Sequence, residues 1–202
     1  MHVKVSVSLI LVYVRQAFMR IKSKLLRTHD IVLDNDSNRL RLFDGDSLKH
    51  EFHYGSITSD NWGSVYEKYV GQVYESNGYE VEYRGLLKGF LDSGIDLIAQ
   101  GPADEFYIQC KYSVRKINNK IGKQKMENIL YKAGNFLHKK YAGKKLSFVL
   151  VVPSVRDMIL PHMEAYFLSK NQLQHQVKLS IVEIPMRLSS FCDPNSLDEV
   201  VK

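Results

Sequence analysis

The segment from Gly94 to Tyr112 constrains the fold most strongly, because it predicts two short strands joined by a tight turn. Residues 94–99 and 105–112 are rich in Ile, Leu, Phe and Tyr, and the turn-forming stretch Gly-Pro-Ala-Asp follows the first run at 101–104. A turn centred between Pro102 and Ala103 pairs residues whose numbers sum to 205. Asp96 is therefore expected opposite Gln109 in an antiparallel ladder.

Further elements are predicted on both sides of this hairpin. Apolar residues recur at helical spacing over 62–74, with Asp60 expected as the N-cap and Asn77-Gly78 as the end of that helix. A strand is expected at 79–84, a long helix at about 117–141, a buried strand at 146–152, a helix at about 156–169 interrupted by Pro161, and a last strand at 178–184. The order α-β-β-β-α-β-α-β predicts an α/β fold, a mixed sheet flanked by helices.

The length of 202 residues suits one ordinary domain with an N-terminal extension. Residues 59–202 are expected to form the main domain and residues 1–58 an extension of unclear role. Within the extension, 31–43 predicts a hairpin that turns at 35–38, because Asn, Asp and Ser favour turns. The apolar run 5–14 is too short to span a bilayer, which needs about 20 residues, so we expect a strand or the start of a buried helix there.

Composition narrows the class of protein and of partner. A hydrophobic fraction of 45% and a charged fraction of 25% are typical of a soluble globular domain. Two cysteines without a CxxC pair indicate a reducing compartment, so we expect a cytoplasmic protein without structural zinc. The net charge of +6 permits polyanionic partners. Between Lys111 and Lys145 there are eleven Lys or Arg residues and one acid, Glu127, which favours phosphate binding over a merely solvated face.

The predicted hairpin brings three chemically useful groups to one place. Side chains alternate along a strand, so Gln109 and Lys111 share the face opposite to Cys110, and Asp96 lies across from Gln109. Magnesium prefers hard oxygen ligands and keeps several waters, so Asp96 is the expected main ligand, completed by the Gln109 oxygen and the Cys110 backbone carbonyl. Lys111 would then stabilise charge on a phosphate or orient the attacking water.

Two alternatives stay open at this point. A buried Asp96–Lys111 ion pair would satisfy both side chains without any catalysis. Cys110 is expected to be a small core residue and not a nucleophile, because no histidine lies near it in the sequence to activate it.

Three strings carry a resemblance to a known family: GSVYEKYVGQVYESNGYEVEY at 63–83, DSGIDLIA at 92–99 and YIQCKYS at 107–113. They resemble the catalytic domain of the Mrr-type restriction endonucleases, within the PD-(D/E)xK nuclease superfamily. The resemblance is close over about 62–112 and looser as far as 152. It implies a restriction-endonuclease-like core and a metal-dependent DNA endonuclease that uses Mg²⁺, with Mn²⁺ able to substitute.

The resemblance also implies roles for individual residues. Asp96, Gln109 and Lys111 match the catalytic positions, and Gln109 stands where most of the superfamily has Asp or Glu and the Mrr branch commonly has Gln. Glu67 matches the family's helix glutamate and is expected to contact the metal through water; the alternative is an ordinary boundary residue. On a helical wheel Glu67 lies on the same ridge as Gly63 and Gly71, which would leave room beside it.

The substrate is expected to be DNA, with backbone contacts from a basic stretch that leads into the next helix. The residues expected to bind DNA are Arg115, Lys116, Lys120, Lys123 and Gln124. Two other functions remain: a structure-selective nuclease similar to the Holliday-junction resolvases, and a catalytically silent DNA-binding module. A homodimer stays open, and no stable membrane partner is expected.

Overall fold

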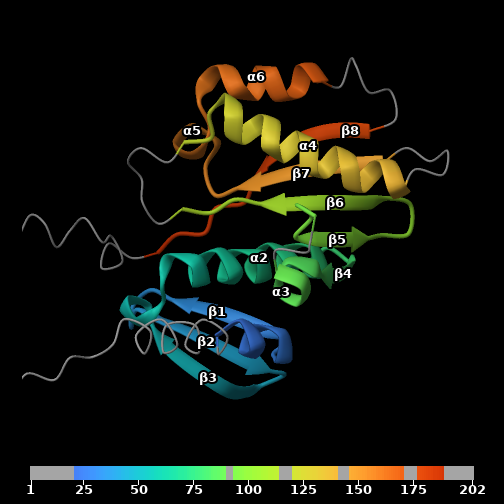
Figure 1. Ribbon diagram of the computed structural model, residues 1–202. Helices are drawn as coiled ribbons and strands as arrows, with labels where there is room; N and C mark the ends of the chain where they lie inside the picture. The colour runs from blue at the N-terminus through green and yellow to red at the C-terminus, as the bar shows by residue number, and fades with distance from the viewer. Residues whose placement is uncertain (1–20, 90–92, 114–119, 141–145, 171–176, 189–202) are drawn as a thin grey trace, which may run out of the picture.

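The second half of the chain forms a mixed sheet of five strands (Figure 1). The computed structural model describes residues 21–89, 93–113, 120–140, 146–170 and 177–188. The strand order is β4-β5-β6-β7-β8, antiparallel from β4 to β6 and parallel from β6 to β8. The strands are β4 (Glu80–Tyr83), β5 (Leu97–Gln100), β6 (Glu105–Cys110), β7 (Leu146–Val152) and β8 (Val177–Glu183).

Helices cover both faces of this sheet, as the predicted α/β order requires. α2 (Ser59–Ser76) lies on one face, and α4 (Lys123–Lys140) and α6 (Pro161–Ser169) lie on the other (Figure 1). Leu97 and Ile108 pack in one hydrophobic cluster with residues of α2, whereas Ile98 and Tyr107 pack in a second cluster with residues of α4 and α6. Because strand side chains alternate, the face that carries Gln109 is also buried by a helix over most of its length.

The amphipathic helix α2 confirms its predicted pattern. Trp62, Tyr66 and Val70 are at most 2% exposed and form part of the core. The helix begins two residues earlier than expected, because Thr58 and not Asp60 is the N-cap, and the Thr58 hydroxyl accepts a hydrogen bond from Asn61 N at 3.4 Å. Asp60 therefore lies in the first turn, where a carboxylate interacts favourably with the helix dipole. At the other end Gly78 has a φ of 86°, as expected for the predicted stop.

The N-terminal region contains a second sheet that packs against α2. Its strands are β1 (Asp30–Asp34), β2 (Arg39–Asp44) and β3 (Ser47–His53), all antiparallel. The first two form the predicted hairpin, and β3 was not predicted. Leu40 and Leu42 of this sheet belong to the same hydrophobic cluster as Trp62, so α2 is buried between two sheets (Figure 1). The boundary between 1–58 and 59–202 stays a prediction.

The structure corrects several expected boundaries near the hairpin and beyond it. β5 begins at Leu97, so Asp96 immediately precedes the strand. α4 begins at Lys123 and not near 117, and Ile121 instead forms a parallel bridge with Ile159. Two short helices, α3 (Arg84–Lys88) and α5 (Val155–Met158), were not predicted as separate elements. Pro161 starts α6 and confirms the predicted interruption.

The prediction for residues 5–14 lies outside the described residues. In the ranges that the structure does describe, no helix has both the length and the apolar character that crossing a bilayer requires.

Two glycines of α2 give a matched test of this packing. A Cβ built on Gly71 would lie 2.3–2.5 Å from the ring and hydroxyl of Tyr83, whereas one built on Gly63 meets nothing within 4 Å. We expect Gly71→Ala to lower the free energy of unfolding by about 1–3 kcal/mol through overpacking. Gly63→Ala should raise it by up to about 1 kcal/mol through helix propensity. Urea unfolding midpoints measure both, and equal effects of the two substitutions would contradict the close Tyr83–α2 contact.

Candidate active site

Hydrogen bonds of its backbone and of its side chain hold Asp96 immediately before β5. Its backbone N donates to Ile108 O at 2.8 Å, its carbonyl accepts from Gly85 N at 2.8 Å, and its Oδ2 accepts from Cys110 N at 2.7 Å. Leu97 pairs with Ile108, which confirms the predicted register of the hairpin. The side chain is 6% exposed, so its carboxylate is fixed in direction and almost removed from solvent.

Glu67 and Asp96 converge on Gly85, which is the first-turn glycine of α3. A Cβ built on Gly85 would lie 2.4 Å from Glu67 Oε2 and 3.2 Å from Asp96 Oδ1. The absence of a side chain at this position therefore lets carboxylates from α2 and from the start of β5 reach one small volume. The predicted room beside Glu67 exists, but Gly71 does not provide it, because the Tyr83 ring fills that space.

Gln109 supplies a further oxygen from β6. The side chain is 5% exposed, and its Oε1 is buried without a hydrogen-bond partner in the described structure. Its Nε2 lies 3.7 Å from a Cβ built on Gly94, which precedes Asp96 by two residues. Leaving a buried acceptor unsatisfied costs about 1–3 kcal/mol. This oxygen is therefore well suited to coordinate a cation or to accept a hydrogen bond from a water molecule.

The pKa of the Cys110 thiol reflects its burial and the charged side chains around it. Burial raises the pKa of its thiol well above the usual value, the negative charges of Asp96 and Glu67 raise it further, and Lys111 opposes them. The three charged side chains thus lie within electrostatic range of one sulfur atom.

The residues expected to bind DNA do not converge on one place as Glu67 and Asp96 do. Lys123 and Gln124 are exposed in the first turn of α4, whereas Lys120 precedes the helix and its Nζ donates to Arg156 O at 3.0 Å. Arg115 and Lys116 lie outside the described residues. Lys132, which sequence reasoning did not single out, comes closer to the site: its Cβ lies 2.9 Å from a Cβ built on Gly94.

The donor set at this place fits a hard divalent cation. Two carboxylates and one unpartnered amide oxygen are the ligand types that Mg²⁺ and Mn²⁺ accept, with water completing the shell. The two carboxylates meet beside Gly85, and Gln109 Oε1 is a buried oxygen without a hydrogen-bond partner in the described structure, so both are oxygen donors of the right kind. Across the described ranges, no group of three or more His, Cys, Asp and Glu side chains is arranged to hold a metal, so any ion here would depend on Gln109, backbone or water oxygens as well.

Comparison with known families agrees with this geometry. Residues 61–142 match the model of the Mrr catalytic-domain family, described as restriction endonuclease. This segment is similar to an Mrr-type catalytic domain. The match runs from the start of α2 through α4 and includes Glu67, Gly85, Asp96, Gln109 and Lys111. It confirms the predicted family and the restriction-endonuclease-like α/β fold, and it assigns the domain to a nuclease superfamily. No curated protein and no solved structure matches the chain.

The environment of Cys110 makes a prediction about its reactivity. Since only the thiolate reacts quickly, a raised pKa should leave Cys110 inert even at about pH 8, near the ordinary pKa of a thiol. In a Cys192→Ser background, we expect iodoacetamide to modify the folded protein more than about tenfold more slowly than the urea-unfolded protein. Mass spectrometry measures the rate. Equal rates in the two states would show that the sulfur is accessible and ionised, contrary to its burial among carboxylates.

Proposed function

We propose that this protein is a divalent-metal-dependent endonuclease that hydrolyses phosphodiester bonds in DNA. The main support is the convergence of Glu67 and Asp96 on the space beside Gly85, inside a segment similar to an Mrr-type catalytic domain. Asp96 is buried and so is Glu67 Oε2; two carboxylates near each other repel, and a bound cation would offset that repulsion. A nuclease of this superfamily needs such a cation beside the phosphate that it cuts.

The proposed metal is Mg²⁺, with Mn²⁺ able to substitute. Asp96 would hold it through Oδ1, because Oδ2 is already bonded to Cys110 N. Glu67 Oε2 reaches the same volume, directly or through a water, and Gln109 Oε1 and the Cys110 carbonyl complete the proposed set. When bound, the ion would polarise the phosphate and lower the pKa of a coordinated water.

Lys111 is proposed to act on the phosphate itself. Its backbone N donates to Val151 O at 2.9 Å, so the residue is anchored between β6 and β7 next to Cys110. From that position its ammonium would stabilise negative charge that develops on the phosphate, or orient the attacking water. Gln109 is neutral, so the site carries one negative charge fewer than a site with Asp or Glu there.

Cleavage assays test the proposal directly. Linear duplex, supercoiled plasmid, single-stranded DNA and a four-way junction would be incubated with Mg²⁺ or Mn²⁺. We expect metal-dependent cutting by the wild type and a loss of about 10²–10³-fold in rate for Asp96→Asn and for Lys111→Ala. Asp96→Asn keeps an oxygen that can accept from Cys110 N, so the fold should survive.

The matched control is Lys178→Ala, an exposed lysine on β8 at the far edge of the sheet, which should cut at the wild-type rate. Cutting that persists in Asp96→Asn, or that survives EDTA, would overturn the proposal. The preferred substrate in the panel separates a restriction-type activity on linear duplex from a junction-selective one.

Gly85 provides an independent test of the carboxylate pair. A methyl group in Gly85→Ala would meet Glu67 Oε2 and Asp96 Oδ1, so Glu67 should swing away. We expect a rise in the Mg²⁺ concentration needed for half-maximal cutting, by roughly tenfold, as is usual when a supporting contact of a metal site is lost. Gly63→Ala, one turn before Glu67 on α2, is the control and should leave that concentration unchanged. If Gly85→Ala needs the same Mg²⁺ concentration as the wild type, Glu67 does not contribute to metal binding.

A further inference from the structure

Three lysines of α4 lie along one line of the helix. Lys125, Lys132 and Lys139 are spaced seven residues apart, and all three are exposed. Seven residues make nearly two turns, so the side chains drift by only about 20° from one to the next. With a rise of 1.5 Å per residue, successive lysines stand about 10.5 Å apart along the axis.

Contacts of neighbouring residues show which way this line faces. The Cβ of Lys132 lies 2.9 Å from a Cβ built on Gly94, and Gln109 Nε2 lies 3.7 Å from the same point. One turn further on, the Phe136 ring stacks 4.7 Å from the guanidinium of Arg84, the first residue of α3. The line therefore faces β5, α3 and the candidate active site.

Gly94 is suited to this close approach. Its φ of 79° lies in the left-handed region, and it has no side chain to collide with the Lys132 stem. The stem of Lys132 therefore packs close to Gly94, which is also near Gln109 Nε2.

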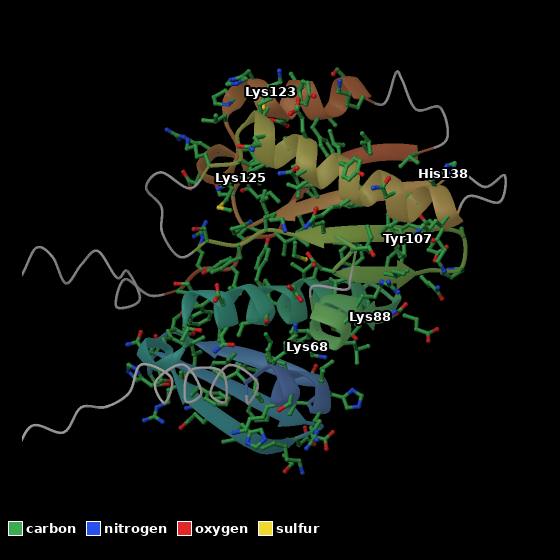
Figure 2. The ribbon with its side chains drawn as sticks, viewed as in Figure 1. Lys68, Lys88, Tyr107, Lys123, Lys125 and His138 are labelled. Carbon is green, nitrogen blue, oxygen red and sulfur yellow. The ribbon has the colours of Figure 1, made fainter. Side chains whose placement is uncertain are left out.

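The charge on α4 is distributed unevenly about its axis. The helix contains five lysines and one acid, Glu127. Glu127 Oε1 accepts a hydrogen bond from Tyr166 OH of α6 at 3.2 Å, so the acid is turned toward α6. The line of three lysines lies on the other flank of the helix. Figure 2 shows Lys125 at the beginning of α4 and His138, the neighbour of Lys139, near its end, so the line extends along most of the helix.

We propose that Lys125, Lys132 and Lys139 form a track for one backbone strand of the substrate, with Lys132 at the phosphate beside the one that is cut. The identity of the polyanion as DNA rests on the proposed function. Lysine side chains are long and flexible, so lysines about 10.5 Å apart along the helix axis can each reach a different phosphate of one strand. Such contacts fix the path of the strand and carry no base sequence information.

The three-stranded N-terminal sheet stands apart from this track. It lies across α2, on the side of the five-stranded sheet opposite to α4 (Figure 1). The track therefore places substrate contacts on α4 and not on residues 30–53.

Binding measured without cleavage tests the track. The protein carries Asp96→Asn to prevent cutting. Dissociation constants for a 30-base-pair duplex, roughly 100 Å long, are measured by fluorescence anisotropy over a range of salt concentrations. Combining Lys125→Ala, Lys132→Ala and Lys139→Ala should reduce the slope of log affinity against log salt by roughly 2.7, since each phosphate contact in a duplex contributes about 0.9.

The control removes the same charge elsewhere, through Lys49→Ala, Lys170→Ala and Lys178→Ala on β3, at the end of α6 and on β8. This control should keep the wild-type slope. Circular dichroism checks that both triple variants fold.

Each outcome decides between the track and the function on which it rests. An unchanged slope in the α4 variant, an equal fall in the control, or no DNA binding by the parent protein would overturn the track. If wild type cuts DNA with Mg²⁺ and the α4 slope is unchanged, the proposed function stands and the track fails. If wild type cuts nothing and the α4 variant still loses the slope, the track stands and the nuclease proposal fails.

Discussion

The hydrogen bond from Cys110 N to Asp96 Oδ2 fixes the geometry on which the rest of the site depends. A carboxylate that is 6% exposed loses most of its hydration, and it stays charged only if fixed dipoles or charges replace the water. One backbone N–H at 2.7 Å meets part of that need and points Oδ1 toward Gly85. Glu67 adds a second carboxylate to the same volume, which makes a cation there more favourable still. The two carboxylates in this volume therefore account both for the electrostatic repulsion in the site and for its proposed metal binding.

The position of Glu67 depends in turn on how firmly α2 is held. One side of the helix packs on the five-stranded sheet and the other on the three-stranded sheet. Gln72 accepts from Ile31 N at 3.0 Å and donates to Asp30 Oδ1 at 3.1 Å, which ties α2 to β1. On the same helix, Lys68 Nζ lies 4.1 Å over the Tyr83 ring, and burial lowers the pKa of this lysine.

Tyr83 transmits this packing to the active site. It is the last residue of β4, and its ring rests on Gly71, so the chain that continues into α3 stays close to α2. That closeness brings Gly85 to Glu67. The N-terminal sheet can support the site in this way without approaching the substrate.

Sequence patterns predicted the parts of the structure that short-range rules decide. The turn at 101–104 fixed the register of β5 and β6, and hence the neighbourhood of Asp96 and Gln109, because a tight turn leaves the ladder little freedom. The periodic apolar face of α2 was equally predictable. The strand β3 was missed because its residues alternate weakly and are mostly exposed, so no apolar pattern marks it.

The remaining differences come from contacts between distant segments. Ile121 fits a helical pattern, yet it pairs with Ile159, and nothing in the local sequence distinguishes a helical apolar residue from one in a bridge. Gly85 lies in a helix of five residues, too short to show a period, and its importance comes only from Glu67 and Asp96. Lys132 looked like any other lysine of a basic stretch until the direction of α4 over Gly94 was known.

The neutral side chain at position 109 follows from the same electrostatics. A third carboxylate beside Glu67 and Asp96 would add a negative charge to a site from which water is largely excluded, and would repel the phosphate that has to enter it. With Gln109, one divalent cation would balance the two carboxylates of the proposed site, and Lys111 would leave a net positive charge for a phosphodiester. The buried Oε1 of Gln109 still supplies an oxygen ligand of the kind that a hard cation accepts. In the proposed site the amide would thus keep the coordinating atom of an acid and lack the charge that would oppose the substrate.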